Sequence, residues 1–342
     1  MKKHAIIPIF IPHRGCPNDC VFCNQRKITA RTDDVTPEDA GRIIDTWLTT
    51  LRPSSDVGKS AGIVEAAFYG GSFTGLPIDE QSSFLEVAWN YKRLGLIDKI
   101  HLSTRPDYID TQILDNLRRY EVDTIELGVQ SLDDNVLKLS NRGHSAADVY
   151  SAVELIQKYG FELGIQLMIG LPGDSEESCI MSAKKTAEMR PSLARLYPTI
   201  VLDETELFEM YRRGDYVPLS RKEAVKRTAE MYRILDDAGI TIMRVGLKST
   251  DIIGEGGAVN GGTYHPAFRQ LVEGEIAKER IEPLLTDMTG SVEICSNSRW
   301  YSNMIGHKAC NRKYFEQEYP SLKIRYSVDD SLPGGRFTVT QV

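Results

Sequence analysis

The sequence predicts an α/β fold, namely an open, partial (β/α)6 barrel of the TIM type with a small α/β extension after it. Short apolar, β-branched segments alternate six times with longer amphipathic segments, which is typical of a parallel sheet whose strands are joined by helices. The short segments are almost continuously apolar, as expected when both faces of a sheet are covered. Six units are fewer than the eight of a closed barrel. A flat doubly wound sheet is the alternative that this pattern leaves open.

The alternating elements run from residue 4 to residue 201. Strands are expected at 4–11, 63–70, 99–104, 124–130, 163–170 and 193–201. Helices are expected between them at 37–51, 79–95, 110–119, 146–159 and 175–189. Their starts carry capping signals, as in Thr36-Pro37-Glu38, where a capping residue precedes a proline in the first turn.

The alternation ends near residue 203, which divides the chain into a barrel at 1–202 and an extension at 203–342. An open barrel has a lateral gap, and a reactive site inside it would need cover from water. We therefore expect the extension to cover the barrel and to contribute to substrate binding. Its expected elements are a helix at 220–238, a strand at 240–247, a glycine-rich loop at 254–262, a helix from about 266, and short strands near 291–297, 322–327 and 336–342.

Composition narrows the class of protein. The 342 residues carry a net charge of -7, which argues against a general polyanion-binding protein. No apolar run of about 18 residues is present, so no membrane span is expected. The first segment is interrupted by Pro8 and Pro12 and lacks a small-residue cleavage site, so it does not read as a signal peptide. The predicted location is cytoplasmic, where thiols stay reduced.

Three of the six cysteines lie together in RGCPNDCVFCNQ at 14–25, with the spacing Cys16-x3-Cys20-x2-Cys23. Soft thiolates at short spacing hold zinc or an iron–sulfur cluster. A zinc site needs a fourth ligand, for which His13 is the nearest candidate, and a set of purely structural thiols is a further alternative. We favour a [4Fe–4S] cluster with one open iron. The loop follows the first strand, and ligands of barrel-like folds bind at that edge.

The pattern C-x3-C-x-aromatic-C after a first strand, with Phe22 in the aromatic place, resembles the signature of the radical S-adenosylmethionine (radical SAM) superfamily. The resemblance covers residues 4–202. It implies that the three cysteines hold the cluster and that S-adenosylmethionine chelates the open iron. It also implies that a reductant such as flavodoxin or ferredoxin supplies the electron that cleaves the cofactor. The resulting 5′-deoxyadenosyl radical abstracts a hydrogen from the substrate.

A glycine pair ends the second expected strand, in YGGSFTGLP at 69–77. Taken alone, it can be a plain turn or a place of close backbone approach to a ligand. Beside the cysteine loop it resembles the superfamily's Gly-Gly-Glu motif, which implies that the backbone of Gly70 and Gly71 binds the methionyl amine. Ser72 stands where glutamate is common, so the role of its side chain stays open.

Polar residues end the third and fourth strands. Ser103 and Arg105 can present a hydroxyl and a guanidinium to a carboxylate or a ribose, although a surface salt bridge is the alternative for Arg105. Glu126 and Gln130 share one face of a strand at a period of two. Burying them is costly unless they are paired or bind something. The sequence therefore predicts a polar site there.

The motifs GVQS, NRGH and GLPG resemble a narrower branch of the superfamily. It is shared by the Elongator catalytic subunit, without its acetyltransferase domain, and the oxygen-independent coproporphyrinogen oxidases. This likeness implies that Gln130 and Arg142 contact the ribose and carboxylate of the cofactor. Gln166 stands where the oxidases carry aspartate and is a candidate ribose contact. Tyr197 and Pro198 are expected at the mouth of the barrel.

Three functions follow as hypotheses. The first is a radical SAM enzyme that modifies a tRNA base, with the basic segments 220–227 and 307–313 as phosphate contacts. The second is a radical SAM enzyme that acts on a small molecule such as a tetrapyrrole. The third is a protein that binds a cluster or zinc without radical chemistry. No residue is assigned to hydrogen abstraction, and Cys179, Cys295 and Cys310 are expected to be small buried hydrophobes, or, for the last two, a pair facing the site.

Overall fold

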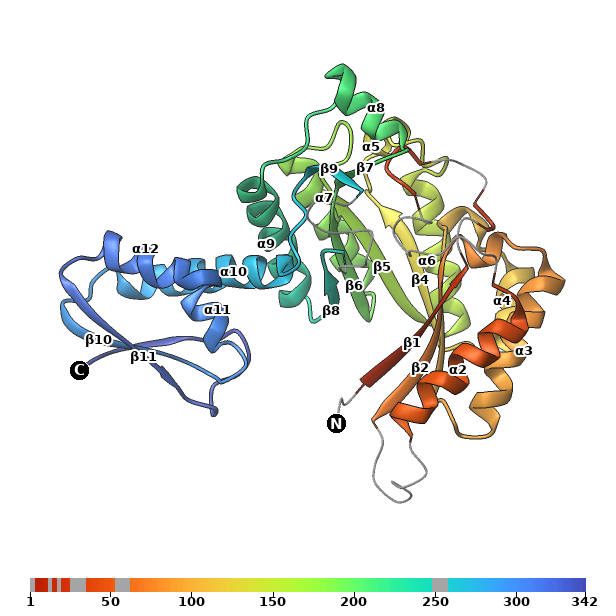
Figure 1. Cartoon of the computed structure of the whole chain (residues 1–342), viewed down its shortest axis with the longest axis horizontal. Helices are drawn as coiled ribbons and strands as arrows, with labels where there is room; N and C mark the ends of the chain where they lie inside the picture. The colour runs from red at the N-terminus through yellow and green to blue at the C-terminus, as the bar shows by residue number, and fades with distance from the viewer. Residues whose placement is uncertain (1–3, 12–13, 17–19, 25–34, 53–61, 248–257) are drawn as a thin grey trace.

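A curled parallel sheet forms the larger part of the molecule (Figure 1). The computed structural model describes residues 4–11, 14–16, 20–24, 35–52, 62–247 and 258–342. The strand order is β1-β2-β3-β4-β5-β6-β8, and the first and last strands are not paired with each other, so the barrel is open. The predicted fold class, a partial barrel with a C-terminal α/β extension, is confirmed.

The elements lie close to their predicted positions. The strands of the sheet are β1 (His4–Ile11), β2 (Ile63–Gly70), β3 (Lys99–Thr104), β4 (Thr124–Gln130), β5 (Glu162–Ile169), β6 (Leu193–Pro198) and β8 (Thr241–Val245). The helices of this part are α2 (Pro37–Leu51), α3 (Ile78–Arg93), α4 (Thr111–Arg119), α5 (Asp134–Leu139), α6 (Ala146–Tyr159), α7 (Glu176–Met189), α8 (Glu206–Arg213) and α9 (Arg221–Asp237). Capping boxes at Thr36, Ser145, Ser175 and Ser220 fix four of the helix starts.

The sheet has one strand more than the six that the sequence predicts. The seventh strand, β8, lies beyond residue 202, in the stretch assigned to the extension. The connection from β6 to α9 contains an inserted strand, β7 (Ile200–Leu202), and the helix α8, and these interrupt the βα alternation that the prediction followed. β7 pairs antiparallel with β9 (Val259–Gly262), so the strand expected at 193–201 is divided between two sheets.

The two faces of the parallel sheet differ in polarity. Because strand side chains alternate between faces, one set of positions packs under the outer helices and forms the main core, with members such as Ile9, Phe68, Leu102 and Leu127. The alternate set lines the concave inner face and carries charge in four strands, at Glu65, His101, Glu126 and Arg195. The strands are therefore less uniformly apolar than those of a sheet with two hydrophobic faces.

The extension forms a separate lobe joined to the barrel by a long helix (Figure 1). Its elements are α10 (Phe268–Leu285), β10 (Gly290–Ser296), α11 (Tyr301–Ile305), α12 (Cys310–Glu318), β11 (Leu322–Val328) and β12 (Thr338–Gln341). Val272 and Ile276 of α10 belong to the barrel core, whereas Ile281 and Leu285 belong to the core of the lobe, so this helix is shared by both. None of the helices in the described ranges is long and apolar enough to cross a membrane. His13, Pro12 and residues 254–257 of the glycine-rich loop lie outside those ranges.

Candidate functional site

The cysteine loop follows β1 at the carboxyl edge of the sheet. The backbone N–H of Cys23 donates to the carbonyl of Cys20 at 2.9 Å, which closes a turn between them. Burial and the neighbouring Cys20 raise the pKa of the Cys16 thiol, while the guanidinium groups of Arg105 and Arg142 oppose this rise. Two cysteines and two arginines are thus close enough to interact. Within the described residues, no three acidic, histidine or cysteine side chains converge on one metal position.

Arg142 joins the cysteine loop to the end of β4. Its Nη1 donates to Cys20 Sγ at 3.1 Å, and its Nη2 donates to the carbonyl of Gly128 at 2.6 Å. The residue is only 6% exposed. Cysteine ligates metals through its sulfur atom. The structure therefore brings a predicted cofactor contact and a predicted cluster ligand together.

The pair Gly70-Gly71 is needed because the backbone at the end of β2 closely approaches the backbone that leads into the cysteine loop. Gly70 has a φ of +114°, which side-chain-bearing residues rarely adopt, and a Cβ on Gly71 would lie 1.9 Å from the carbonyl oxygen of Arg14. The N–H of Gly71 donates to the carbonyl of Ile11 at 2.8 Å. These glycines let the end of β2 pack directly on the start of the cysteine loop. Binding of the methionyl amine by their backbone stays a prediction.

The side chain of Ser72, whose role the sequence leaves open, is part of the fold. It is 1% exposed, its Oγ lies 2.9 Å from Thr104 Oγ1, and it accepts a hydrogen bond from the backbone N–H of Arg105 at 3.2 Å. Thr74 Oγ1 lies 2.5 Å from the same Thr104 oxygen. This hydroxyl cluster ties the end of β2 to the end of β3. Thr74 and Thr104 were not predicted as site residues.

Arg105 is held in an ion pair with Asp107. Its Nε and Nη2 donate to the two carboxylate oxygens of Asp107 at 2.9 and 2.8 Å. The salt bridge considered as an alternative for Arg105 is thus present, between a buried arginine and an exposed aspartate. Asp107 fixes the direction of the guanidinium beside the cysteine loop.

Gln130 is a predicted site residue with an unsatisfied buried atom. It ends β4 at a bulge in the pairing with β5, and its φ is +67°. Its Oε1 is buried and has no hydrogen-bond partner in the described part of the chain. Buried polar atoms are nearly always paired, so an unpaired one beside a candidate site points to a missing ligand. Gln130, Arg142 and the three cysteines are called the mouth residues below.

Val21 and Phe22 anchor the cysteine loop through apolar contacts. Val21 packs in a small apolar cluster with Val201, Leu207 and Tyr216, and Phe22 lies against this cluster. The N–H of Leu207 donates to the carbonyl of Val21 at 2.7 Å. The stretch from β7 to α8 therefore holds the loop in place, and α8 lies in the part of the chain that the sequence assigned to the extension. A contact of Phe22 with the cofactor stays a prediction.

Glu126 lies at the centre of a buried ionic cluster on the concave face. It is 0% exposed. Its Oε1 lies 2.8 Å from Arg195 Nε and accepts from Gln166 Nε2 at 2.5 Å, while its Oε2 lies 2.9 Å from His101 Nε2. The same Nε2 of Gln166 donates to Ser103 Oγ at 3.3 Å. The pairing that the sequence requires of a buried glutamate is thus supplied by protein side chains.

The cluster continues through two further strands. His101 Nδ1 pairs with Glu65 Oε1, and the other oxygen of Glu65 lies 2.8 Å from His4 Nε2. At the other end, Arg195 Nη2 donates to Tyr69 Oη at 2.5 Å. The concave network is the name used below for its members, which are His4, Glu65, Tyr69, His101, Glu126, Gln166 and Arg195.

Electrostatics fix the charge states in this network. Burial alone would lower the pKa of His101, but the carboxylates of Glu126 and Glu65 raise it to about 9. Burial alone would raise the pKa of Glu126, but Arg195 and His101 lower it to about 2. At neutral pH, two carboxylates therefore face one imidazolium and one guanidinium. Removing any one of these charges leaves another buried without its partner.

Sequence reasoning missed five members of the network. His4, Glu65, Tyr69, His101 and Arg195 each lie in a segment recognised only as an apolar strand. The available signal was a charged residue or a histidine in each of four further strands, besides the Glu126 that was noticed. Parallel registers place Ser103 opposite Glu126 and Gln166 opposite Arg195, and these registers cannot be read from one strand at a time.

The structure is that of an α/β protein whose open parallel barrel carries a cysteine loop after its first strand. The family models identify the family. The Radical SAM superfamily model matches residues 10–185, and the Radical_SAM C-terminal domain model matches residues 191–278. The chain belongs to the radical SAM superfamily, whose members imply a [4Fe–4S] cluster and S-adenosylmethionine. The chain is thus a radical SAM enzyme.

Several relatives are named for tRNA modification or as Elongator proteins. The chain is 26% identical over 292 residues to a tRNA uridine(34) acetyltransferase of Methanocaldococcus infernus, a match that covers 72% of this chain and 54% of the relative. It is 28% identical over 199 residues to human Elongator complex protein 3, covering 52% and 36%. The chain therefore spans little more than half the length of the first of these relatives.

A solved structure supports the fold. The archaeal Methanocaldococcus infernus Elp3 with an N-terminal deletion superposes with a TM-score of 0.64 at 22% identity, covering 82% of this chain and 64% of that one. At this identity the likeness shows the fold alone. It agrees with the observed arrangement of a partial barrel followed by an extension.

Proposed function

We propose that Cys16, Cys20 and Cys23 hold a [4Fe–4S] cluster and that the mouth residues bind S-adenosylmethionine beside it. Three thiols on one short loop, at the carboxyl edge of the strands, are a suitable donor set. When bound, the cluster supplies one electron that cleaves the cofactor and starts radical chemistry. The observation that carries this proposal is the arrangement of Arg142, which touches Cys20 Sγ, beside Gln130, which has an unpaired buried oxygen.

The polar residues around the mouth orient the cofactor in this proposal. Gln166 donates through one nitrogen to both Glu126 and Ser103, which fixes its amide and leaves its Oε1 to accept from a ribose hydroxyl. Asp107 holds Arg105 in a direction from which it favours a carboxylate near the cysteines. Glu126 acts through Gln166 as a positioning residue, because both of its oxygens already have protein partners.

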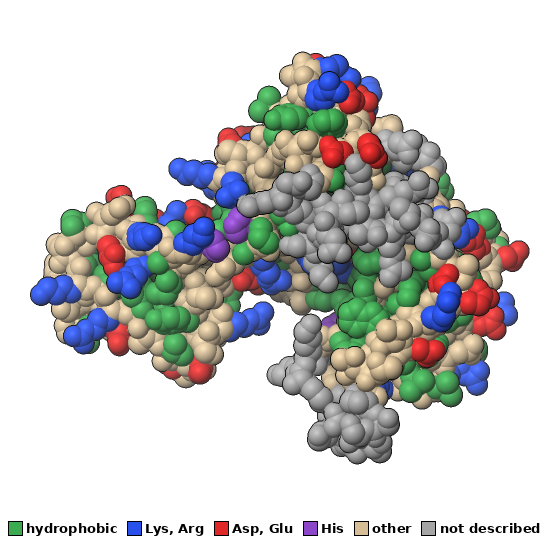
Figure 2. Space-filling view, viewed as in Figure 1, with side chains coloured by type: hydrophobic (Ala, Val, Ile, Leu, Met, Phe, Trp, Pro, Cys, Tyr) green, Lys and Arg blue, Asp and Glu red, His purple; other side chains and the backbone are tan. Residues whose placement is uncertain are grey.

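We further infer that the substrate is a nucleoside in tRNA. The names of the relatives support this, since one acts on uridine 34 of tRNA by its name. The lobe also offers basic side chains on the face shown in Figure 2. Lys308 and Lys313 of the lobe are exposed, whereas Arg312 is paired with Glu316 at 2.8 Å.

The test uses anaerobically reconstituted protein with S-adenosylmethionine and dithionite, with and without tRNA from a strain that lacks this protein. We expect tRNA to be consumed as a substrate, so that a nucleoside in its digest changes mass only in the complete reaction. The Cys20→Ala variant is the matched control. Cofactor cleavage with every tRNA nucleoside unchanged would contradict the tRNA substrate. It would favour a small molecule such as a tetrapyrrole.

A further inference from the structure

Arg244 is an unneutralised cation on the concave face. It lies in β8, the last strand of the open sheet, and its register partner across the β6–β8 pairing is Arg195. Register partners in a parallel pair point to the same side, so both arginines face the inside of the barrel. Arg195 is neutralised by Glu126 at 2.8 Å. Among the residues that the structure describes, Arg244 has no ion-pair or hydrogen-bond partner.

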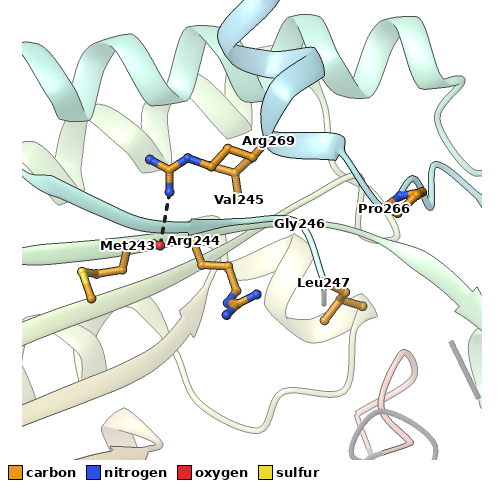
Figure 3. A pocket seen from close by; sticks show the side chains of 7 residues that line it. All are labelled: Met243, Arg244, Val245, Gly246, Leu247, Pro266 and Arg269. Atoms are coloured by element: carbon orange, nitrogen blue, oxygen red, sulfur yellow. Dashed lines mark hydrogen bonds between the residues drawn. The ribbon is translucent and has the colours of Figure 1, made fainter. Parts of the chain in front are cut away.

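A cavity of about 470 Å³ opens beside Arg244 at the carboxyl end of β8 (Figure 3). It is lined by residues of β8, by the two residues after this strand, and by Pro266 and Arg269 before and at the start of α10. Figure 3 shows Arg244, from β8, and Arg269, from α10, on opposite sides of β8. The carboxyl ends of the strands are where ligands bind in folds of this type.

Arg269, the second arginine of the cavity, already has hydrogen-bond partners in the protein. Arg269 Nε donates to Glu273 at 2.8 Å, and its Nη1 donates to the carbonyls of Ile242 and Met243 at 3.1 and 3.2 Å. These bonds satisfy carbonyl groups of the edge strand β8 and hold the start of α10 against it. Of the two guanidinium groups at the cavity, only that of Arg244 is left for a ligand.

We propose that Arg244 binds a phosphodiester of the RNA strand that enters the barrel, next to the nucleotide that reacts. A guanidinium presents paired N–H donors that match two oxygens of one phosphate. The charges of the concave network cancel one another, so Arg244 gives the inner face a net positive charge in a protein of net charge -7. This inference rests on the proposed function. It places the phosphate backbone of the RNA substrate at Arg244.

The test is the salt dependence of tRNA binding by cluster-loaded protein between 20 and 200 mM KCl. Loss of one phosphate contact in Arg244→Gln reduces the slope of log affinity against log salt by about 0.7 to 0.9 and lowers affinity at every salt concentration. Arg244→Lys keeps the charge and should restore most of the slope. Arg119→Gln removes an exposed arginine from the outer helix α4 and is the matched control, with the slope of the wild type. Thermal melting checks that every variant is folded.

The outcomes separate this inference from the proposed function. A reduced slope in Arg244→Gln, together with the wild-type slope in Arg119→Gln, supports the inference. Wild-type binding with the same slope in Arg244→Gln, or an equal loss in Arg119→Gln, overturns the phosphate contact and leaves the tRNA substrate standing. No binding of tRNA by the wild type at 20 mM KCl overturns the tRNA substrate, and the inference with it.

Discussion

The mouth residues and the concave network are both polar and both buried, yet they are completed in different ways. In the network, both oxygens of Glu126 meet protein cations or amides within 3 Å, and His101 lies between two carboxylates. At the mouth, Gln130 Oε1 is buried without a partner, and Arg142 divides its donors between a backbone carbonyl and a cysteine sulfur.

This difference separates residues whose polar groups are paired within the protein, and which stabilise the fold, from residues that we propose to be completed by a bound ligand. Burial of a polar group predicts only that it must be satisfied, by protein or by something bound. Where the partners are side chains on neighbouring strands, substitution should cost stability. Where a partner is missing, substitution should cost ligand affinity. Substitutions in the two groups of residues should therefore differ in whether they lower stability or ligand affinity.

The largest effect is expected at the cysteines. Changing Cys16, Cys20 or Cys23 to Ala removes one of three thiolate ligands, and we expect loss of the cluster and of its absorbance near 400 nm after anaerobic reconstitution. Iron and sulfide analysis measures this. Cys295→Ala, in β10 of the lobe, is the matched control and should keep a full cluster. Tightly bound zinc in place of iron in the wild type would contradict the cluster assignment.

The next largest effect is expected in the concave network. Glu126→Gln removes one charge, which leaves Arg195 buried without its carboxylate and His101 with one carboxylate, that of Glu65. This should lower the free energy of unfolding by about 3–5 kcal/mol. Urea denaturation measures it. Glu188→Gln, at an exposed position of α7, should change stability by no more than about 0.5 kcal/mol. If Glu126→Gln is as stable as the wild type, the network is not what holds this face together.

A smaller effect of the opposite kind is expected at the mouth. Arg142→Lys cannot keep both the contact with Cys20 Sγ and the bond to the Gly128 carbonyl, because lysine lacks the planar fork of donors. Affinity for S-adenosylmethionine should fall about tenfold or more, as expected for a lost hydrogen bond to a charged group. The free energy of unfolding should stay within about 1 kcal/mol. Calorimetric titration and urea denaturation measure the two quantities, and unchanged affinity would remove Arg142 from the cofactor site.

The most gradual effect is expected from pH. The pKa of His101 is raised from 6.5 to about 9 in the folded protein, so its contribution to stability is complete below pH 6.5 and is lost as pH rises through about 9. Glu126, with a pKa lowered to about 2, stays ionised over this range. Stability measured at pH 6, 7.5 and 9 should therefore decline, and His101→Gln should flatten the decline. Parallel declines in the two proteins would show that other groups cause it.

The sequence predicts the barrel well because each of its elements carries its own local signal. The six predicted strands and their intervening helices match the structure to within a few residues, since apolar runs, capping residues and glycines act within one element. β8 was assigned to the extension because β7 and α8 interrupt the alternation before it. Its place beside β6 is a long-range pairing that no local pattern encodes.

The sequence marks the candidate ligating residues of the site, and says much less about the residues that support them. Cys16, Cys20 and Cys23 stand out by spacing alone, and Arg142 by a motif. By contrast, the sequence left the role of the Ser72 side chain open, and the structure shows its contact with Thr104. His101 and Arg195 gave no sign of the partner that each has on Glu126. Such pairs depend on the register between strands, which is set by the whole sheet.

The central claim is that the three cysteines and the mouth residues form a radical SAM site. It is tested most directly by measuring 5′-deoxyadenosine after anaerobic reconstitution, with S-adenosylmethionine and dithionite present. We predict that the wild type forms 5′-deoxyadenosine and that Cys16→Ala, Cys20→Ala and Cys23→Ala form none. A reconstituted protein that contains the cluster and binds S-adenosylmethionine but forms no 5′-deoxyadenosine would contradict the account.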